Sequence, residues 1–282
     1  MTKSSVSPVQ IIKVNVNNSS ALPDLLAMEE PLEIRLGYGL NQHREQKSIS
    51  VTMRTPGNDF ELALGFLFTE GIIKSTEEII QIKYCTEANT IENQFNIVRV
   101  ELNENSDIDF AKLQRNFYTT SSCGVCGKAS IDAIHTLCDI QQNNTFTVTN
   151  TTLFELPDTL RKTQNVFEHT GGLHACALFN NKGELQLSRE DVGRHNALDK
   201  LIGAALGSNQ IPLTNSILLL SGRASFELIQ KASMAGIPIV AAVGAPSSLA
   251  VQLAQELNIS LVGFLREQRF NIYSAPERID IK

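Results

Sequence analysis

The sequence predicts an α/β protein in which a smaller mixed α+β region precedes a parallel sheet covered by helices. Short apolar strands alternate with amphipathic helices in the last third of the chain, and the connections between them are short. That order is typical of βαβ units, whose strands lie parallel in one sheet. The expected strands are 216–220, 237–243 and 259–264, and the expected helices are 224–235 and 247–257.

The first half predicts a separate mixed unit. A turn at 54–58, rich in Pro and Gly, precedes a helix that begins at Asp59 and ends near Gly71. We expect one domain over 1–115 and a second over 116–282. The other expected strands are 32–36, 48–53, 94–102, 173–179 and 184–187, and the other expected helices are 153–164, 196–206 and a short one with Ile131, Ile134 and Cys138 on one face.

Composition excludes several classes of protein. The 282 residues are 42% hydrophobic and 19% charged, which argues against wholesale disorder. A net charge of −6 argues against general binding to nucleic acid or to an anionic membrane. The longest apolar runs, such as 237–243, are too short to span a membrane, and the first ten residues are too polar for a signal peptide. We therefore expect a cytoplasmic protein.

Two of the five cysteines, Cys123 and Cys126, form a Cys-x-x-Cys at the expected start of a helix. The helix dipole, free N–H groups and nearby Lys128 favour a reactive thiolate there. Two other interpretations remain open: half of a zinc site, and a buried structural pair. His174 and Cys176 could complete a zinc site, but on an apolar strand they are more typical of packing residues. Hydrolytic deamination is poorly supported, because Cys176 stands where that chemistry needs a Glu.

Polar residues also gather at the expected strand ends. Asp191 and His195 belong to a run that holds acid, base, imidazole and amide groups before a helix, which exceeds what capping requires. Ser221, Gly222 and Arg223 follow a strand and open a helix, as in a phosphate-binding turn. The turn at 244–248 and the run at 264–269 occupy the corresponding places after the next two strands. Together they favour a nucleotide-like ligand, although each alone is also typical of an ordinary αβ connection.

These motifs together resemble those of the FdhD family, the sulfur carrier or sulfurtransferase proteins required for formate dehydrogenase activity. The resemblance covers nearly the whole chain and is specific, because many motifs occur in the same order. They are Glu30–Leu32, Met53–Gly57, Leu64–Gly71, Ser121–Lys128, Gly171–His174, Asp191–Ala197, Ser221–Arg223 and Leu261–Phe264.

The resemblance implies a function. A cysteine desulfurase would donate sulfur to Cys123 as a persulfide, with Cys126 as the second catalytic thiol. The sulfur would pass to the molybdenum cofactor, bis-molybdopterin guanine dinucleotide, before its insertion into formate dehydrogenase. The resemblance also implies a homodimer, and a second domain with the three-layer αβα fold of cytidine deaminases. Cys176 receives no role, since the family usually has a small residue there. The cofactor-binding residues expected are Phe264, Leu265, Arg266, Glu267, Gln268, Arg269, Ser221, Gly222, Arg223, Asp191 and His195; no resident metal is expected.

One alternative belongs to a different functional class. Zinc bound by Cys123 and Cys126 would make the protein a zinc-stabilised chaperone that binds the cofactor without transferring sulfur. A stoichiometric zinc ion on this pair would favour the chaperone over the sulfur carrier.

Overall fold

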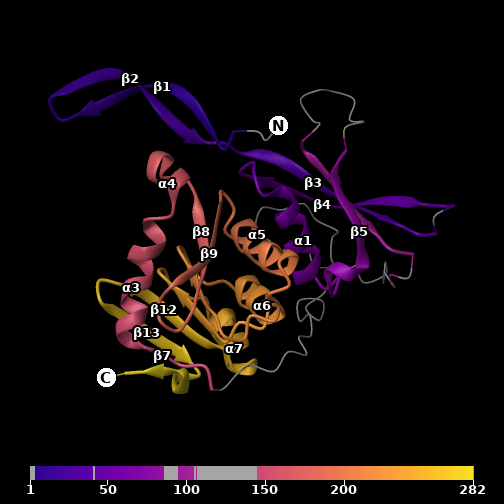
Figure 1. The fold of residues 1–282 in the computed structure, drawn as a ribbon. Helices are drawn as coiled ribbons and strands as arrows, with labels where there is room; N and C mark the ends of the chain where they lie inside the picture. The colour runs from indigo at the N-terminus through magenta and orange to yellow at the C-terminus, as the bar shows by residue number, and fades with distance from the viewer. Residues whose placement is uncertain (1–3, 41, 86–94, 105, 107–144, 282) are drawn as a thin grey trace.

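A computed structural model describes residues 4–40, 42–85, 95–104, 106 and 145–281 of the chain. Two main sheets organise these residues, and a two-stranded ribbon projects from them (Figure 1). The expected boundary between residues 115 and 116 lies outside the described residues, as does the helix expected around Ile131. No helix within the described ranges is both long enough and apolar enough to cross a membrane.

The larger sheet has six strands in the order β13-β12-β11-β10-β8-β9. Its three central strands are parallel, and the strands flanking them run antiparallel. This arrangement confirms the alternation predicted from the sequence. The strands are β8 (His174–Phe179), β9 (Leu185–Asp191), β10 (Ile217–Leu220), β11 (Ile239–Ala242), β12 (Ser260–Arg266) and β13 (Arg269–Ser274), and the helices between them are α5 (Arg194–Gly207), α6 (Phe226–Met234) and α7 (Ser248–Glu256).

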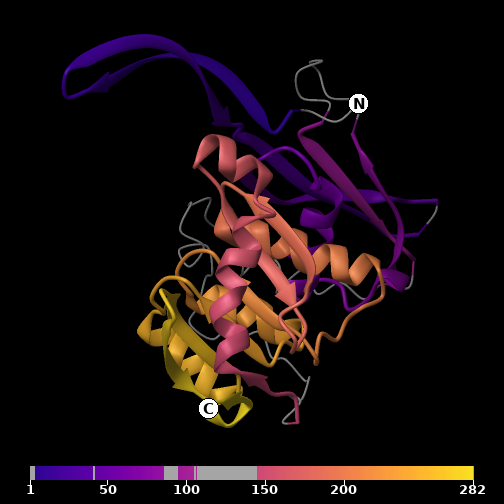
Figure 2. The same cartoon turned by 60° about the vertical axis from the view of Figure 1, so that its left-hand side comes forward.

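Both faces of this sheet are covered, because its central strands are apolar on both sides. In β10, Ile217 and Leu219 pack against α3 (Asn150–Arg161), whereas Leu218 and Leu220 face the core shared with α5, α6 and α7. Figure 2 shows α3 crossing in front of the sheet. The larger sheet is therefore the middle of three layers. The specific likeness to cytidine deaminases stays a prediction.

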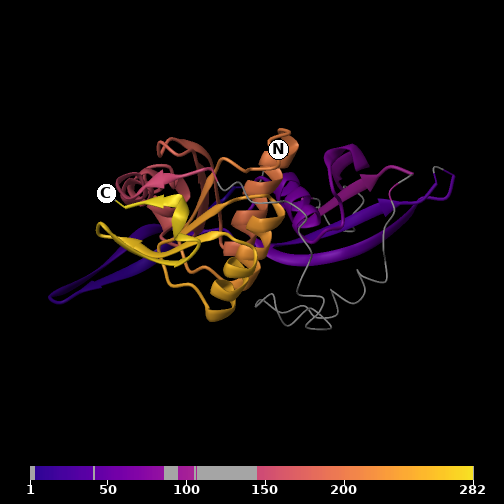
Figure 3. The same ribbon diagram turned by 90° about the horizontal axis from the view of Figure 1, so that it is seen from below.

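The smaller sheet has the order β4-β3-β6-β5, and its apolar face joins the same core as α5 to α7. Helix α1 (Asp59–Thr69) packs beside α5 between the two sheets (Figure 3). One continuous core thus spans the two sheets. The strands are β3 (Glu30–Tyr38), β4 (Glu45–Arg54), β5 (Ile79–Tyr84) and β6 (Ile97–Leu102).

Several elements differ from the sequence-based expectations. The ribbon of β1 (Val6–Asn15) and β2 (Asn18–Ala27) was not expected, and its apolar Ile12 and Val14 are each 73% exposed. Strand β9 extends to Asp191, four residues beyond the expected end, because Ser188 to Glu190 pair with β8. Elements β5, β13, α4 (Asn165–Thr170) and the short pair β7 (Val148–Thr149) and β14 (Ile279–Asp280) were also not expected. Their mixed, partly exposed sequences carry little periodic signal.

Two glycines let α1 and α5 approach closely. A Cβ atom on Gly65 would collide with the carbonyl oxygen of Asp199, and one on Gly203 would collide with that of Glu61. Both obstacles are helix backbone, which cannot rotate away as a side chain can. The sequence therefore needs glycine at both positions for this crossing to form.

We expect Gly65→Ala to lower the free energy of unfolding by about 3 kcal/mol or more, since overpacking against fixed backbone is at the costly end of such changes. Urea denaturation measures this. Gly207→Ala is the matched control in α5, because a Cβ there meets its nearest atom at 3.8 Å. Equal stability of the Gly65→Ala variant and the wild type would contradict the close crossing.

Candidate functional site

The turns that follow β10, β11 and β12 meet at one edge of the larger sheet. The amide of Gly244 donates to the carbonyl of Gly222 at 2.9 Å, and the amide of Phe264 donates to that of Gly244 at 3.0 Å. Parallel strands place their carboxyl ends at the same edge, where α/β proteins bind ligands. We call this region, residues 221–225, 244–247 and 264–269 together with His195, the strand-end site.

The strand-end site holds two arginines without ionic partners in the described structure. Arg223 and Arg266 are both exposed, and neither forms an ion pair with a described residue. Arg269 differs, because its guanidinium lies 3.4 Å from the carboxylate of Glu267. Helices α6 and α7 begin at this same edge, and helix N-termini favour anions. The arrangement suits a small anionic ligand.

The hairpin between β12 and β13 has unusual backbone geometry. Phe264, Glu267 and Gln268 have φ values of 55°, 53° and 56°, a left-handed conformation that non-glycine residues rarely adopt. Successive positive φ values suit the tight two-residue turn between Arg266 and Arg269. Strained residues of this kind cluster at functional sites. Leu265 is an exception among the expected cofactor-binding residues, because it is 0% exposed and packs in the core.

Asp191, also expected to bind the cofactor, is fully buried. Its carboxylate lies 2.7 Å from the Nζ atom of Lys200 and accepts a hydrogen bond from the amide of Thr55. The amide of Gly193 and the side chain of Asn196 donate to its other oxygen. These contacts hold the start of α5 in place, and a ligand contact by Asp191 stays a prediction.

Ser221 is similarly engaged. Its Oγ accepts the amide hydrogen of Ala175 at 2.9 Å, and its own amide donates to the carbonyl of Ala175 at 3.0 Å. These bonds extend the β8–β10 pairing by one residue. Ser221 therefore fixes the position of Gly222 and Arg223.

His195, by contrast, is partly exposed at the start of α5 and reaches the start of α6. Its Nε2 lies 3.2 Å from Oγ of Ser225 and 3.7 Å from a carboxylate oxygen of Glu227. Burial raises the pKa of Glu227, but hydrogen bonds from His195, its own amide and Ser225 outweigh burial and lower that pKa to about 2. Glu227 is therefore ionised at neutral pH.

Comparison with known proteins identifies the family. The model of the FdhD/NarQ family matches residues 27–280. The chain belongs to the FdhD/NarQ family. It is 50% identical over 277 residues to a protein of Streptomyces coelicolor named sulfur carrier protein FdhD, covering 97% of this chain and 95% of that one. A protein of the same name from Sulfurisphaera tokodaii is 40% identical, covering 97% and 99% of the two chains.

A solved structure supports the fold as well. The crystal structure of a protein from Desulfotalea psychrophila, described as a formate dehydrogenase accessory protein, superposes with a TM-score of 0.75 at 26% identity. The match covers 98% of this chain and all of that one. The overall arrangement of sheets and helices is thus shared with that protein.

The Cys-x-x-Cys pair of this family member lies outside the described residues, so the structure gives no geometry for Cys123 or Cys126. Cys176 is described and fully buried, and burial raises the pKa of its thiol, which makes it unreactive. Within the described ranges no three His, Cys, Asp or Glu side chains form a group suited to a metal ion. The zinc interpretation depends on Cys123 and Cys126 and stays open.

Sequence reasoning missed three residues of the strand-end site and its surroundings. Ser225 and Glu227 were absent from the expected set, although a serine before a helix with an acid two positions later is a recognisable pattern. His174 was interpreted as a packing residue, yet it is only half-buried. Its Nδ1 lies 3.3 Å from where a Cβ atom on Gly222 would stand.

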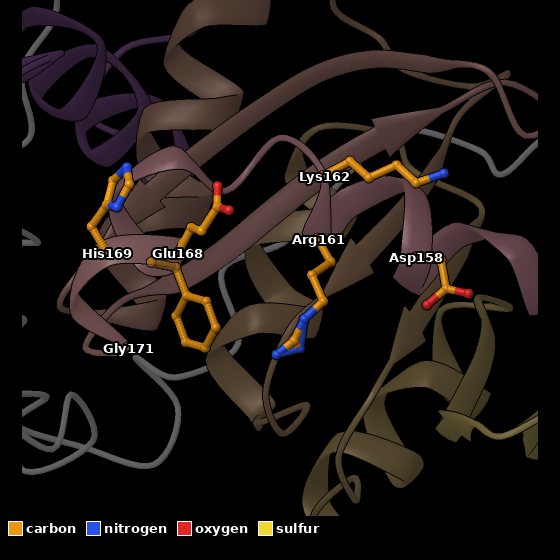
Figure 4. A pocket seen from close by; sticks show the side chains of 7 residues that line it. Asp158, Arg161, Lys162, Glu168, His169 and Gly171 are labelled. Carbon is orange, nitrogen blue, oxygen red and sulfur yellow. The ribbon is translucent and has the colours of Figure 1, made fainter.

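A cavity of about 830 Å³ lies elsewhere, between the end of α3 and α4 (Figure 4). The guanidinium of Arg161 lies over the ring of Phe167 there, 5.6 Å from its centroid. Asp158 and Glu168 line the cavity together with Arg161 and Lys162, so the lining favours neither an anionic nor a cationic ligand. It contains none of the expected site residues, and we assign it no function.

The lowered pKa of Glu227 predicts a pH dependence of stability. A carboxyl group whose pKa falls from 4.5 to about 2 on folding stabilises the protein above pH 4.5, and this contribution disappears as the pH falls toward 2. We expect the free energy of unfolding of Glu227→Gln to fall less than that of the wild type between pH 4.5 and pH 2. Chemical denaturation at a series of pH values measures it. Glu256→Gln, an exposed change on α7, should leave the profile unchanged; a Glu227→Gln profile equal to wild type would refute the assignment.

Proposed function

We propose that this protein is a cytoplasmic sulfur carrier for the maturation of formate dehydrogenase. In this proposal a cysteine desulfurase transfers sulfur to Cys123, and the protein then donates that sulfur to bis-molybdopterin guanine dinucleotide bound as a substrate. The names of its relatives, sulfur carrier protein FdhD and formate dehydrogenase accessory protein, support this role. So does the alignment over nearly the full length of both chains.

The observation that carries the cofactor part of the proposal is the strand-end site. A guanine dinucleotide contains a diphosphate, and an acidic protein must supply local positive charge to hold it. Arg223 and Arg266 supply that charge, and neither is neutralised by a described carboxylate. Small residues at Gly222 and Gly244 let the backbone of the turns approach the ligand.

The sulfur chemistry requires a thiol and a source of electrons. The Cys123 thiolate attacks the outer sulfur of the desulfurase persulfide, which forms the Cys123 persulfide and releases the desulfurase thiol. The outer sulfur must gain two electrons to leave as sulfide. Attack of the Cys126 thiolate on the inner sulfur provides them, because it forms a Cys123–Cys126 disulfide and releases hydrosulfide to the cofactor. Reduction of that disulfide by a cellular dithiol completes the cycle.

We expect Cys123→Ala to abolish formate dehydrogenase maturation in a complementation assay, because the variant lacks the sulfur-accepting thiol. Intact-mass spectrometry after incubation with a desulfurase and cysteine should show added sulfur on the wild type and none on the variant. Cys126→Ala should also impair maturation.

Cys138→Ala is the control and should leave maturation near normal. An active Cys123→Ala variant with an inactive Cys138→Ala variant would contradict the assignment. A stoichiometric zinc ion that disappears in Cys123→Ala and Cys126→Ala, with no added sulfur on the wild type, would favour the zinc-stabilised chaperone instead.

Arg223→Ala tests the ligand part of the proposal. A hydrogen bond to a charged group contributes roughly 1.5–3 kcal/mol, so we expect guanosine diphosphate to bind at least about tenfold more weakly. Calorimetric titration measures this, and Cys123 should still acquire sulfur in the variant. Equal affinities would remove Arg223 from the site.

A further inference from the structure

The ribbon of β1 and β2 has one apolar face. Successive side chains of a strand point to opposite sides, and residues paired across two strands lie on the same side. The pairing runs along all ten residues of each strand without a shift. The even-numbered residues of 6–14 therefore share a face with the odd-numbered residues of 19–27, and we call it the ribbon face. Eight of its ten side chains are apolar, whereas the opposite face carries Lys13 and Asp24.

The ribbon face is open to solvent. Ile12 and Val14 are each 73% exposed, and Leu25, which pairs with Pro8, is 36% exposed. Five of the twelve large apolar side chains that are exposed in the described ranges belong to the ribbon, so they are concentrated there. A two-stranded ribbon by itself is only marginally stable in water, and a contiguous exposed apolar surface marks an interaction site. The ribbon face therefore fits a protein partner.

The ribbon face begins beside the strand-end site. Its last residue, Ala27, lies against the turn before β8, where a Cβ atom on Gly172 would stand 3.5 Å from the Cβ of Ala27. Two residues further along, Nδ1 of His174 lies 3.3 Å from where a Cβ atom on Gly222 of the strand-end site would stand. From there the ribbon projects past α4, away from the two main sheets (Figure 1, Figure 2). A protein bound along the ribbon face is thus held next to the strand-end site.

The edges of the ribbon suit a partner less well than its face does. Addition of a strand at an edge depends on main-chain hydrogen bonds, and Pro8 in β1 and Pro23 in β2 have no N–H to donate. Proline and lysine on edge strands hinder pairing with another chain, and Lys13 adds a charge to β1. The partner therefore packs on the face of the ribbon and does not extend it by a strand.

The size of the ribbon face favours a transient partner. From ordinary strand dimensions, one face of a ribbon ten residues long measures about 34 Å by 10 Å, or about 340 Å². Each partner in a stable complex buries about 800 Å². One ribbon face against another is therefore too small to hold a stable dimer, whereas contacts of this size are typical of transient complexes. A carrier that must release its acceptor needs a transient contact.

We propose that the ribbon face docks the apoenzyme of formate dehydrogenase and holds its cofactor site next to the strand-end site. This proposal rests on the proposed function, in which the cofactor passes from this protein to that enzyme, and it names the surface through which the acceptor binds. The matching surface of the acceptor is an uncharged, apolar strip beside the entrance to its cofactor site. Docking there brings the donor and acceptor sites together for the transfer.

Biolayer interferometry with immobilised apo formate dehydrogenase, purified from cells that cannot make the molybdenum cofactor, measures the docking. We expect the double variant Ile12→Thr, Val14→Thr to bind at least about tenfold more weakly, because it loses apolar contact while both positions stay β-branched. Leu25→Thr on the facing strand should act in the same direction. Ile80→Thr is the matched control and should bind like the wild type, because Ile80 is 59% exposed on β5 of the smaller sheet.

Two further readouts separate docking from folding and from sulfur uptake. The substituted side chains are exposed, so the variants should unfold at the same urea concentration as the wild type. Guanosine diphosphate affinity and the sulfur that a desulfurase adds to Cys123 should also stay unchanged, because the ribbon face binds the acceptor alone.

The outcomes distinguish failure of the docking surface from failure of the proposed function. Equal binding of the wild type and the folded double variant overturns the docking surface and leaves the sulfur carrier intact. So does a wild type that takes up sulfur on Cys123 but does not bind the apoenzyme. A wild-type dimer that dissociates in the double variant during sedimentation shows that a second copy covers the ribbon face, and also overturns it. Binding that requires Ile12 and Val14 in a protein that takes up no sulfur supports the docking surface and contradicts the sulfur carrier.

Discussion

The buried carboxylate of Asp191 is the interaction on which the site's geometry depends. It joins the end of β9, the turn after β4 and the interior of α5 through Thr55 and Lys200. Lys200 also donates to the carbonyl of Thr55 at 2.8 Å. Both members of the ion pair are therefore hydrogen-bonded to the backbone of Thr55, in the turn after β4. Removing one partner of such a buried pair typically costs about 3–5 kcal/mol. The Asp191–Lys200 pair lies at the start of α5, beside His195. Although its own role is structural, it therefore sets the position of a residue of the strand-end site.

This anchor works together with the close contact of α1 and α5. Because Gly65 and Gly203 bring the two helix backbones together, the side chains beside them must match closely. There Asp199 accepts a hydrogen bond from Thr69 and pairs with Lys231 of α6 at 2.9 Å. The positions of α5 and α6 are thereby fixed relative to each other and to α1. The distance between His195 at the start of α5 and Ser225 at the start of α6 is therefore fixed as well.

The sequence predicted the parts of the fold whose periodicity is strong. Strands β10, β11 and β12 are buried on both faces, so their apolar runs are unmistakable, and the turns after them could be placed at one edge. The ribbon of β1 and β2 was missed because its strands are mostly exposed and lack a buried alternation. The protein contacts of the expected site residues were harder to predict, since Asp191 and Ser221 accept hydrogen bonds from backbone amides far away in the sequence. These partners, the amides of Thr55 and Ala175, come close only once β8, β9 and the turn after β4 are assembled in the fold.

The charge distribution is compatible with the proposal that this acidic protein binds a small anion. Its net charge of −6 repels extended polyanions, whose binding depends on many phosphate contacts at once. Most described arginines elsewhere are paired, as Arg54 is with Asp59 and Arg189 is with Glu61. Arg194, Arg223 and Arg266 stand apart because no described carboxylate pairs with them. Since all three lie at or beside one sheet edge near the N-termini of α5 to α7, their field is local and short in range. A compact diphosphate can reach it fully, whereas a long nucleic acid would also meet the acidic surface.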